Sequence, residues 1–321
     1  MPRPPITLVT PALADANNGN WQTARRWARL LAEAYRVDLR AQWRPGDPAG
    51  RLLIALHARR SAASVAAWPA DRPVLLVLTG TDLYRDIGTD AAAQASLARA
   101  DALVVLNRLG ADALPPALRA KAVVVLQSVA AHQGGARPVR HLQALAVGHL
   151  RVEKDPHTLW AAMRLLADRP DVHLDQIGRA LDPALGAEAQ ALAAALPGTY
   201  RWLGERPHAE VRRRLARASV LVHPSRMEGG AHVVIEALRS GTPVLASRID
   251  GNLGLLGADW PATFEPGDAA GLAQWLRRLR DDPALCLSLS DLARARAADF
   301  APEREQAALQ GLVARWLNGR R

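Results

Sequence analysis

The sequence predicts an α/β protein made of two doubly wound parallel-sheet domains in tandem, facing a cleft between them. Short runs rich in valine, leucine and isoleucine alternate with longer amphipathic stretches, which is the pattern of parallel strands connected by helices. The alternation stops once, in QSVAAHQGGARPVR (127–140), and then resumes. A length of 321 residues also suggests two domains rather than one.

The first half contains five candidate strands, each an almost unbroken apolar run. They are ITLVT (6–10), RLLIALH (51–57), PVLLVLTG (73–80), ALVVLN (102–107) and AVVVLQ (122–127). Helices are expected between them over WQTARRWARLLAEAY (21–35) and over the alanine-rich residues 91–100. Sheets built from such strands are covered on both faces and bind ligands beyond the carboxyl ends of their strands.

The stretch 127–140 reads as an interdomain linker, because it contains Gly-Gly and Pro and has no periodicity. Five further candidate strands follow it. They are LQALAVG (142–148), VHLDQIG (172–178), YRWLG (200–204), SVLVHPS (219–225) and PVLASR (243–248). Helices bounded by proline run from Pro266 to the end. We therefore predict domains at residues 1–136 and 137–300, with a final helical segment at 301–321.

Composition narrows the class of protein. The formal net charge of +10 and the pI of about 11.0 raise nucleic acid and membrane surfaces as partners. Nearly all basic residues are arginines spread over many helices, so we expect neither a nucleic-acid partner nor a stable membrane association. The single cysteine, Cys286, excludes an internal disulfide and a thiolate zinc cluster. The N-terminus reads as a first strand, and no run approaches the ~18 apolar residues of a membrane span, so we expect a cytoplasmic protein.

The stretch SRMEGGAHVVIEALRSGTPVLAS (225–247) follows an apolar strand and starts a helix. A helix N-terminus offers free N–H groups and a positive dipole end to an anion, and the small residues 229–231 let a phosphate approach the backbone. Glu228 and Glu236, eight residues apart, face roughly the same side. A carboxylate can accept two hydrogen bonds from a vicinal diol. We interpret the stretch as a nucleotide-sugar site; the alternative is a first-turn acid that complements the helix dipole.

A second strand-to-helix turn lies in VGHLRVEKDPHTLWAAM (147–163). Gly148 ends the strand, and Arg151 and Lys154 follow it in the turn. Lys154 is one of only two lysines in a chain that otherwise uses arginine, which points to a phosphate contact. Taken alone, this segment fits ordinary surface charge better than a phosphate contact.

Together the two stretches resemble the retaining glycosyltransferases of family GT4, over nearly the whole chain. The matching motifs are the two glutamates with seven residues between them, the following EALRSGTPVLAS, and Gly148 with Lys154 six positions on. The resemblance implies the GT-B fold of two Rossmann-like domains, with the last helix (301–319) returning to the first domain. It also implies a metal-independent reaction, because basic side chains and a helix N-terminus neutralise the leaving diphosphate. No obvious Asp-x-Asp metal motif occurs here.

The resemblance implies a role for each donor-site residue. Catalytic roles fall to Glu228, which orients the sugar, and to Lys154 and Arg151, which hold the diphosphate. Glu236 holds the ribose, and LGERPHAEV (203–211) lies where the uracil pocket begins. The implied donor-binding residues are Gly229, Gly230, Ala231, His232, Glu236 and Arg206.

Two departures from the GT4 pattern affect the assignment. The family often has arginine directly after the glycine, where this chain has His149, and we expect Arg151 to replace that arginine. The segment VLTGTDLYRD (77–86) resembles the family's T-x-H-G-x-D stretch, with Thr79 in place of a histidine that commonly lies near the reacting sugar and acceptor. This loss argues against an ordinary alcohol acceptor.

A narrower resemblance is to the selenosugar synthases of selenoneine biosynthesis, GT4-like enzymes that join a UDP-activated sugar to selenophosphate through a carbon–selenium bond. The matching segments are TPALADANNGNWQTARRWARLL (10–31), LIALHARRSAAS (53–64), LTGTDLYRD (78–86), GHLRVEKDP (148–156) and SRMEGGAHVVIEAL (225–238). Selenophosphate is anionic and soft near neutral pH, so it can attack without a general base. The resemblance implies UDP-glucose or UDP-N-acetylglucosamine and selenophosphate as substrates, with no cofactor and no metal.

An anionic acceptor needs positive charge in the first domain, and we expect it at the carboxyl ends of that domain's strands. The candidate acceptor-binding residues are Gly19, Asn20, His57, Arg59, Gly80, Thr81 and Asp82. Further cationic candidates are Arg25, Arg26, Arg60 and Arg85, of which one or two are expected to serve. Asp82 has an alternative role as a cap of the turn that follows it.

Alternative functions stay open on the sequence. One is a GT4-type retaining transferase that acts on a hydroxyl acceptor such as a lipid, a wall component or a small alcohol. Another is a non-catalytic UDP-sugar-binding protein on the same fold. A nucleic-acid binder is a more distant alternative, which strong salt-dependent DNA binding would favour. The sequence does not fix the preferred UDP-sugar, the anomeric outcome or the oligomeric state.

Overall fold

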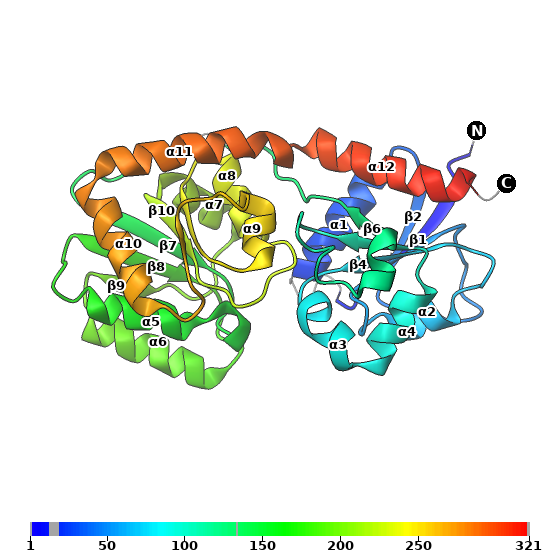
Figure 1. Ribbon diagram of the computed structural model, residues 1–321, viewed down its shortest axis with the longest axis horizontal. Helices are drawn as coiled ribbons and strands as arrows, with labels where there is room; N and C mark the ends of the chain where they lie inside the picture. Colours follow the sequence, from blue (N-terminus) through cyan, green and yellow to red (C-terminus); the bar gives the residue numbers. More distant parts are fainter. Residues whose placement is uncertain (1, 13–18, 133, 320–321) are drawn as a thin grey trace. The chain divides into compact units, whose positions relative to one another are not determined.

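The computed structural model describes residues 2–12, 19–132 and 134–319, and the chain divides into two compact units (Figure 1). The first unit comprises Met1–Ser128, Glu228–Gly230 and Pro302–Arg321, and the second comprises Val129–Met227 and Ala231–Ala301. Parts of three sequence-based assignments, namely the segment 10–31, the linker 127–140 and the segment 301–321, lie outside the described residues.

The first unit contains a parallel six-stranded sheet in the order β2-β1-β3-β4-β5-β6. Its strands are β1 (Pro5–Val9), β2 (Arg36–Arg40), β3 (Leu53–Leu56), β4 (Val74–Leu78), β5 (Ala102–Val105) and β6 (Ala122–Val124). Its α-helices are α1 (Gly19–Leu31), α2 (Ala62–Ala67), α3 (Ile87–Thr89), α4 (Ala91–Arg99) and α12 (Pro302–Asn318). A π-helical turn spans Asp82–Asp86, and a 3-10 helix spans Pro116–Lys121.

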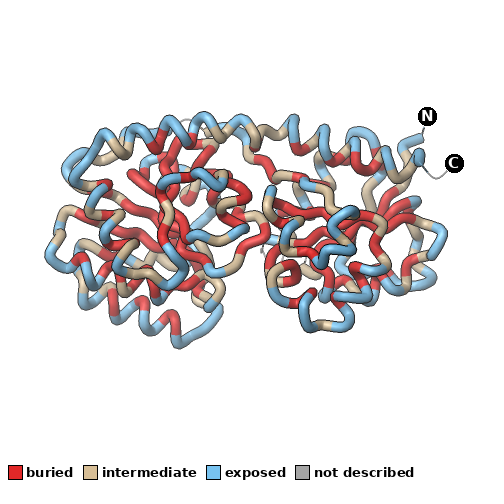
Figure 2. The backbone as a smooth tube through the Cα atoms, in the orientation of Figure 1, coloured by how far each residue is buried: buried red, intermediate tan, exposed pale blue. Residues whose placement is uncertain are grey.

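Two apolar cores cover the two faces of this sheet, because neighbouring strand residues point to opposite sides. Ile6 and Leu8 of β1 belong to one core, which includes Trp27 of α1 and Leu309 of α12. Val9 belongs to the other core, to which α2 and α4 contribute. Figure 2 shows that the strands at the centre of each unit are largely buried.

The second unit contains another parallel six-stranded sheet, in the order β12-β11-β10-β7-β8-β9. Its strands are β7 (Leu142–Val147), β8 (Val172–Ile177), β9 (Tyr200–Trp202), β10 (Val220–His223), β11 (Val244–Ser247) and β12 (Thr263–Phe264). Its α-helices are α5 (Pro156–Leu165), α6 (Pro183–Ala195), α7 (His208–Arg217), α8 (His232–Arg239), α9 (Asp250–Leu256), α10 (Ala269–Asp281) and α11 (Pro283–Ala297). Short 3-10 turns span Val152–Lys154 and Ala298–Phe300.

The predicted fold class is confirmed, since each of the ten predicted strand ranges overlaps an observed strand. The prediction misses two strands. β2, with the sequence RVDLR, lies at a sheet edge, where charged residues are tolerated and no continuous apolar run forms. β12 has only two residues, too few for any periodicity. The helix predicted at 21–35 is α1, which begins at Gly19 and ends at Leu31.

A buried glutamate fixes helix α12 within the first unit. Glu305 is 2% exposed, and its carboxylate accepts hydrogen bonds from Arg26 Nε at 2.9 Å and from Trp27 Nε1 at 2.7 Å, both on α1. The Ser128 backbone N–H donates to the same carboxylate at 2.8 Å. The Glu305 side chain therefore connects α12 to α1 and to Ser128, the last residue of the segment Met1–Ser128.

Candidate active site

The topology of the second unit indicates where a ligand binds. The chain passes from β7 to β8 and β9 on one side, and then crosses to β10, β11 and β12 on the other. The switch point of this sheet therefore lies between β7 and β10, and ligands of such sheets bind outside the carboxyl ends of the strands at that point. Gly148 follows β7 and Ser225 lies just after β10, so both stretches identified in the sequence begin at this edge.

The loops after β7 and β8 continue the hydrogen bonding of the sheet. The Gly148 N–H donates to the Ile177 carbonyl at 2.9 Å, and Leu150 forms a parallel bridge with Ala180. Gly178 has a φ of 148°, and a Cβ at this position would overlap the Gly148 carbonyl. Only glycine fits there. Gly178 is absent from the sequence-based candidates, although a glycine that ends a buried strand is an available signal.

Lys154 folds back over Gly148. The turn at Val152–Lys154 brings the lysine Cδ to 3.4 Å from the position that a Cβ on Gly148 would occupy. Asp155 follows in a left-handed conformation, with a φ of 45°, and its carboxylate accepts from Thr158 Oγ1 at 2.7 Å. Gly148 and Lys154, six positions apart in the sequence, therefore lie close together in the structure. Asp155, the next residue, is the N-cap of α5.

Arg226, from the loop after β10, joins the same turn. Its Nε lies 2.9 Å from Asp155 Oδ2, and its backbone N–H donates to the Glu153 carbonyl at 2.9 Å. Arg151 Nε is 4.0 Å from Glu153 Oε2. Three cations, Arg151, Lys154 and Arg226, therefore lie on adjoining loops at the switch edge, which suits a diphosphate. Arg226 is a second residue that the sequence-based candidates omit; its signal is a basic residue directly after a buried strand.

Buried polar side chains hold the loop that follows β10. Ser247 Oγ donates to the Ser225 carbonyl at 2.5 Å, and Asn252 Nδ2 donates to the Ser247 carbonyl at 3.0 Å. His223 Nε2 lies 3.3 Å from Ser225 Oγ. All four side chains are buried, so these hydrogen bonds determine the path of the chain where β10 ends.

Glu236 on α8 is an ionised and oriented carboxylate. It is 5% exposed, and its Oε1 lies 2.5 Å from His208 Nε2 and 3.5 Å from His232 Nδ1. Burial alone would raise the pKa of Glu236, but the hydrogen bonds from the two histidines outweigh it and hold the pKa at about 2. The N-cap residue of α8, Ala231, supplies no side-chain cap. The Glu236 carboxylate can thus accept hydrogen bonds from hydroxyl groups. It lies on a helix whose first-turn N–H groups have no side-chain cap and suit an anion.

His149 does not supply the permanent charge of the arginine that the GT4 pattern often has. Its Nδ1 accepts from the Arg179 N–H at 3.2 Å, and burial lowers the pKa of His149 although Glu205 opposes the shift. The permanent positive charges on this loop are those of Arg151 and of Lys154, which lies over Gly148. Arg206 is exposed, and its Nη1 donates to the Glu205 carbonyl at 3.1 Å.

The switch point of the first unit lies between β1 and β3, because the chain passes from β1 to β2 on one side and then crosses to β3. Gly19 and Asn20 begin α1 after β1, and His57 directly follows β3. Three predicted acceptor residues therefore lie in the segments that follow these two strands.

His57 is a strained and buried histidine. Its φ of 72° is left-handed, which is uncommon for a residue other than glycine. Its Nδ1 accepts from the Arg60 N–H at 3.4 Å, and its Nε2 lies 3.3 Å from Thr81 Oγ1. Burial lowers the pKa of His57 although Asp82 raises it, so the ring is neutral at pH 7. With Nδ1 as an acceptor, the Nε2 carries the proton.

Asp82 supports the backbone around this histidine. It is fully buried, and its Oδ1 accepts from the Thr79 and Gly80 N–H groups at 2.9 Å each. Its Oδ2 accepts from the Ala58 N–H at 2.9 Å. Both oxygens are thus used to join the ends of β3 and β4. The alternative role of Asp82, as a side-chain cap of the turn that follows it, is not what the structure shows, because no side chain caps the turn at Asp82–Asp86.

Several candidate arginines of the first unit already have carboxylate partners. Arg59 Nε and Arg85 Nε each lie 3.1 Å from one oxygen of the buried Asp86. Arg26 is paired with Glu305. The structure shows no ion pair with a carboxylate for Arg25 or Arg60 in the described parts of the chain, and both are exposed.

The predicted residues divide between the two units. Gly19, Asn20, His57, Arg59, Gly80, Thr81, Asp82, Glu228, Gly229 and Gly230 belong to the first unit. Arg151, Lys154, Arg206, Ala231, His232 and Glu236 belong to the second.

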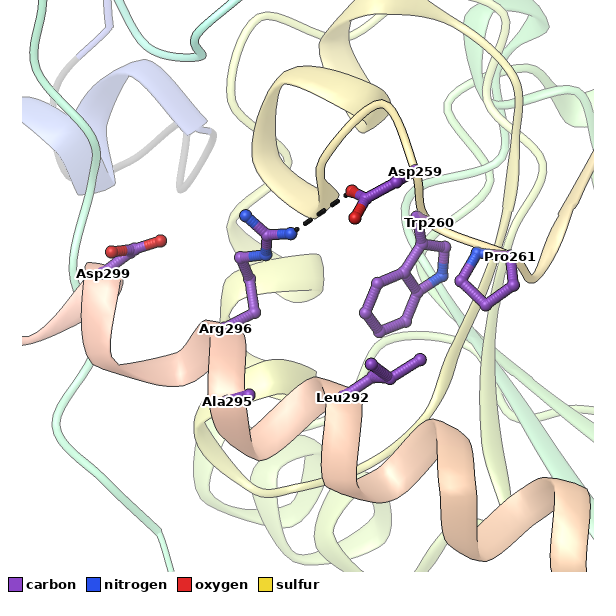
Figure 3. Close-up of a pocket in the computed structure, with 7 residues that line it drawn as sticks. All are labelled: Asp259, Trp260, Pro261, Leu292, Ala295, Arg296 and Asp299. Atoms are coloured by element: carbon purple, nitrogen blue, oxygen red, sulfur yellow. Dashed lines mark ion pairs between the residues drawn. The ribbon is translucent and has the colours of Figure 1, made fainter.

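The second unit also contains a cavity of about 180 Å³ (Figure 3). Its lining consists of Asp259, Trp260, Pro261, Leu292, Ala295, Arg296 and Asp299. Arg296 Nη2 reaches across it to within 3.5 Å of Asp259 Oδ1. No predicted site residue lines this cavity, so it is not the candidate site.

Among the described residues, no group of three or more His, Cys, Asp or Glu side chains is arranged to hold a metal ion. No helix formed by these residues is long and apolar enough to cross a membrane.

Solved structures share this architecture over almost the whole chain. Sucrose-phosphate synthase from Thermosynechococcus elongatus matches with a TM-score of 0.80 and 20% identity, covering 99% of this chain and 100% of that chain. Anabaena Alr3699/HepE, solved in complex with UDP-glucose, matches with a TM-score of 0.76 and 16% identity, covering 97% of this chain and 100% of that chain. These likenesses define the class: the protein has the GT-B glycosyltransferase fold.

The sequence places the chain within one family of that class. Residues 101–296 match the family described as glycosyl transferases group 1, and the chain belongs to this family. Glycogen synthase of Mycobacterium tuberculosis strain H37Rv is 33% identical over 162 residues, which are 49% of this chain and 39% of that protein. D-inositol 3-phosphate glycosyltransferase of Streptomyces avermitilis is 30% identical over 174 residues, which are 51% of this chain and 37% of that protein. The match thus spans about two fifths of the length of these relatives.

Proposed function

We propose that the protein transfers a sugar from a UDP-sugar, either UDP-glucose or UDP-N-acetylglucosamine, to selenophosphate. One observation carries the donor half of the proposal. At the switch point of the second unit, Lys154 is folded over Gly148, and Glu236 is held ionised on α8 by His208. Cations and a fixed carboxylate at one sheet edge suit a diphosphate and a ribose.

These positions support the donor roles that the GT4 resemblance implies. Lys154, Arg151 and Arg226 neutralise the diphosphate, whose charge grows as the bond to the sugar breaks. Glu236 accepts hydrogen bonds from the ribose hydroxyls, and Glu228 orients the sugar. Within the second unit, the proposed donor site also includes the backbone of Ala231 and His232 and the loop around Arg206. That Alr3699/HepE was solved with UDP-glucose supports this class of donor.

The acceptor half rests on charge and on Thr79. Arg60 is exposed beside His57 and has no carboxylate partner among the described residues. Selenium attacks the anomeric carbon while the bond from that carbon to the UDP oxygen breaks, and the electron pair of that bond leaves with UDP. No proton has to be removed from the nucleophile, which fits a threonine where GT4 enzymes often have histidine.

The test is anaerobic incubation of the protein with selenophosphate and either UDP-sugar. Mass spectrometry looks for the selenium isotope envelope on a hexose product, with UDP release measured alongside. We expect product in wild type and in E265Q, which removes an exposed carboxylate of the second unit, and little or none in E236Q or K154A. We also propose a metal-independent reaction, so the yield should persist with excess EDTA.

A second candidate is transfer to a hydroxyl acceptor. It is favoured by the pairing of Arg59 and Arg85 with Asp86, which reduces the positive charge available to an anionic acceptor. UDP release with a small alcohol, and no selenium-containing product from either donor, would move the assignment to this candidate. Binding of UDP-sugar without turnover on any acceptor would identify a non-catalytic binding protein.

A further inference from the structure

The second unit contains a larger cavity that no predicted site residue lines. Its volume is about 680 Å³, within the range of pockets that hold small ligands. Its lining consists of Ala136, Arg137, Pro138, Gln143, Leu145, Asp175, Arg201, Glu210, Arg213, Arg214, Arg217 and Ala218. We refer to it as the arginine pocket.

The arginine pocket lies toward the opposite end of the sheet from the candidate donor site. Ala136 to Pro138 precede β7, and Gln143 is the second residue of that strand. Arg217 is the last residue of α7, which returns the chain to the start of β10. The donor loops, in contrast, follow the carboxyl ends of β7 and β10. The floor is one face of the sheet, where Leu145, Asp175 and Arg201 are aligned across β7, β8 and β9.

The carboxylates of the pocket are already satisfied. Arg201 forms two hydrogen bonds to the buried Asp175, at 2.8 and 3.0 Å, and Arg214 adds a third at 3.1 Å. Arg214 Nε also donates to Glu210 at 2.8 Å. The pocket lining contains five guanidinium groups and only these two carboxylates, so three of the positive charges have no negative charge to balance them.

Arg137 is a half-buried cation that contacts only neutral acceptors in the described structure. Its Nη1 donates to Ser290 Oγ at 2.7 Å, and its Nη2 donates to the Gly241 carbonyl at 2.6 Å. Burial lowers the pKa of Arg137, and the nearby Arg294 lowers it further. A partly desolvated cation without a counter-charge is costly, and an anion in the pocket would relieve that cost.

Arg213 and Arg217 supply the other two unbalanced charges. Both are exposed on α7, and no ion pair between either side chain and a carboxylate occurs among the described residues. Arg217 is positioned by packing, since a Cβ on Gly135 would come to 2.6 Å from its Cγ. The two guanidinium groups are thus free to contact a ligand above Leu145.

We propose that the arginine pocket binds a small anion that carries two or more phosphate groups. Guanidinium groups match phosphate oxygens with two parallel hydrogen bonds, which makes arginine better suited than lysine to this ligand. A concave cavity favours a compact molecule over a nucleic-acid backbone or a lipid surface.

The test is calorimetric titration of the full chain with inorganic tripolyphosphate, in the presence of saturating UDP so that the donor site is occupied. We expect saturable binding of one tripolyphosphate per chain in wild type. R213A/R217A should weaken it by about tenfold or more, because two charge-assisted contacts are lost. R36A/R164A removes two exposed arginines outside the pocket and is the matched control, with wild-type affinity expected.

Two outcomes would overturn the proposal. One is equal binding in R213A/R217A and R36A/R164A, which would mean that tripolyphosphate senses only the net charge of the protein. The other is tight binding of single-stranded RNA or of phosphatidylserine vesicles at physiological salt that tripolyphosphate does not displace. The readout is binding with UDP present, so its outcome is independent of which acceptor the enzyme uses.

Discussion

His208 Nε2 lies 2.5 Å from Glu236 Oε1, and this pair connects the first residue of α7 to the second turn of α8. Glu236 is buried whereas the His208 side chain is largely exposed, so the histidine covers the carboxylate from the solvent side. The hydrogen bond that His208 donates to Glu236 raises the pKa of His208, and burial opposes that rise. The pair therefore keeps a carboxylate ionised in a place where burial alone would favour its neutral form.

The first prediction concerns the charge of Glu236. E236Q keeps the shape of the side chain but removes the anion that is proposed to accept hydrogen bonds from the ribose hydroxyls. Loss of a hydrogen bond to a charged group costs about 1.5–3 kcal/mol, which corresponds to about 10- to 150-fold weaker UDP binding. Calorimetry with UDP measures the change, and E265Q is the control. Unchanged UDP affinity in E236Q would remove Glu236 from the donor site.

The second prediction concerns pH. His208 has a pKa raised above its ordinary value of 6.5, so its contribution to stability is fully present below that pH and is lost as pH rises through the folded-state pKa. Glu236 has its pKa lowered from 4.5 to about 2, so its contribution is present above pH 4.5 and is lost as pH falls toward 2. The stability difference between wild type and H208Q should therefore be largest between pH 4.5 and 6.5.

Urea unfolding at a series of pH values measures this difference. Arg212 and His232 also face the pair, and Arg212 lowers the pKa of His208. R212A is therefore expected to extend the stabilised window to higher pH. A wild-type to H208Q difference that is constant from pH 4.5 to 9 would show that the ion pair makes no contribution to stability.

The third prediction concerns Gly178. G178A places a Cβ on the Gly148 carbonyl, so the loop that carries Lys154 has to move. Gly198 is the matched control, because it also has a positive φ, 87°, but a Cβ there would meet nothing within 4 Å. We expect both variants to lower the melting temperature, G178A by more, and only G178A to weaken UDP binding. Equal effects of the two variants on UDP binding would contradict the close contact between the two loops.

The fourth prediction concerns the attachment of α12. E305A leaves Arg26 and Trp27 without their common acceptor, and removing one partner of a buried ion pair costs about 3–5 kcal/mol of unfolding free energy. E303A removes an exposed acid from the first turn of the same helix and controls for the helix dipole. Denaturant unfolding compares the two variants. A similar small loss in both would mean that the buried pair does not stabilise the first unit.

Much of the fold is predictable from the sequence because buried parallel strands are continuous apolar runs, as in VLLVL of β4. The same reasoning fails at β2, whose exposed edge position lets arginine and aspartate alternate with apolar residues. It also fails at β12, which is too short to show a pattern.

The candidate site is less predictable, because sequence gives the charges but not their partners. Arg26 is paired with a glutamate 279 residues away, so its neutralisation by Glu305 leaves no local signal. The same holds for Glu236, whose partner His208 is 28 residues earlier on another helix. A spacing motif predicts that two residues lie close together more directly when both belong to one turn, as Gly148 and Lys154 do.

The last prediction distinguishes the roles of Arg59 and Arg60, two neighbouring arginines that follow β3. Arg60 has no carboxylate partner among the described residues, whereas Arg59 neutralises the buried Asp86. R60A should raise the KM for selenophosphate by about tenfold, the effect of one lost charge-assisted contact, and leave the KM for the UDP-sugar and the melting temperature unchanged. R59A should lower the melting temperature, because Asp86 then loses one of the two arginines that pair with it. Steady-state kinetics with each substrate varied in turn measures the split, and an R60A enzyme with wild-type KM for selenophosphate would exclude Arg60 as the acceptor contact.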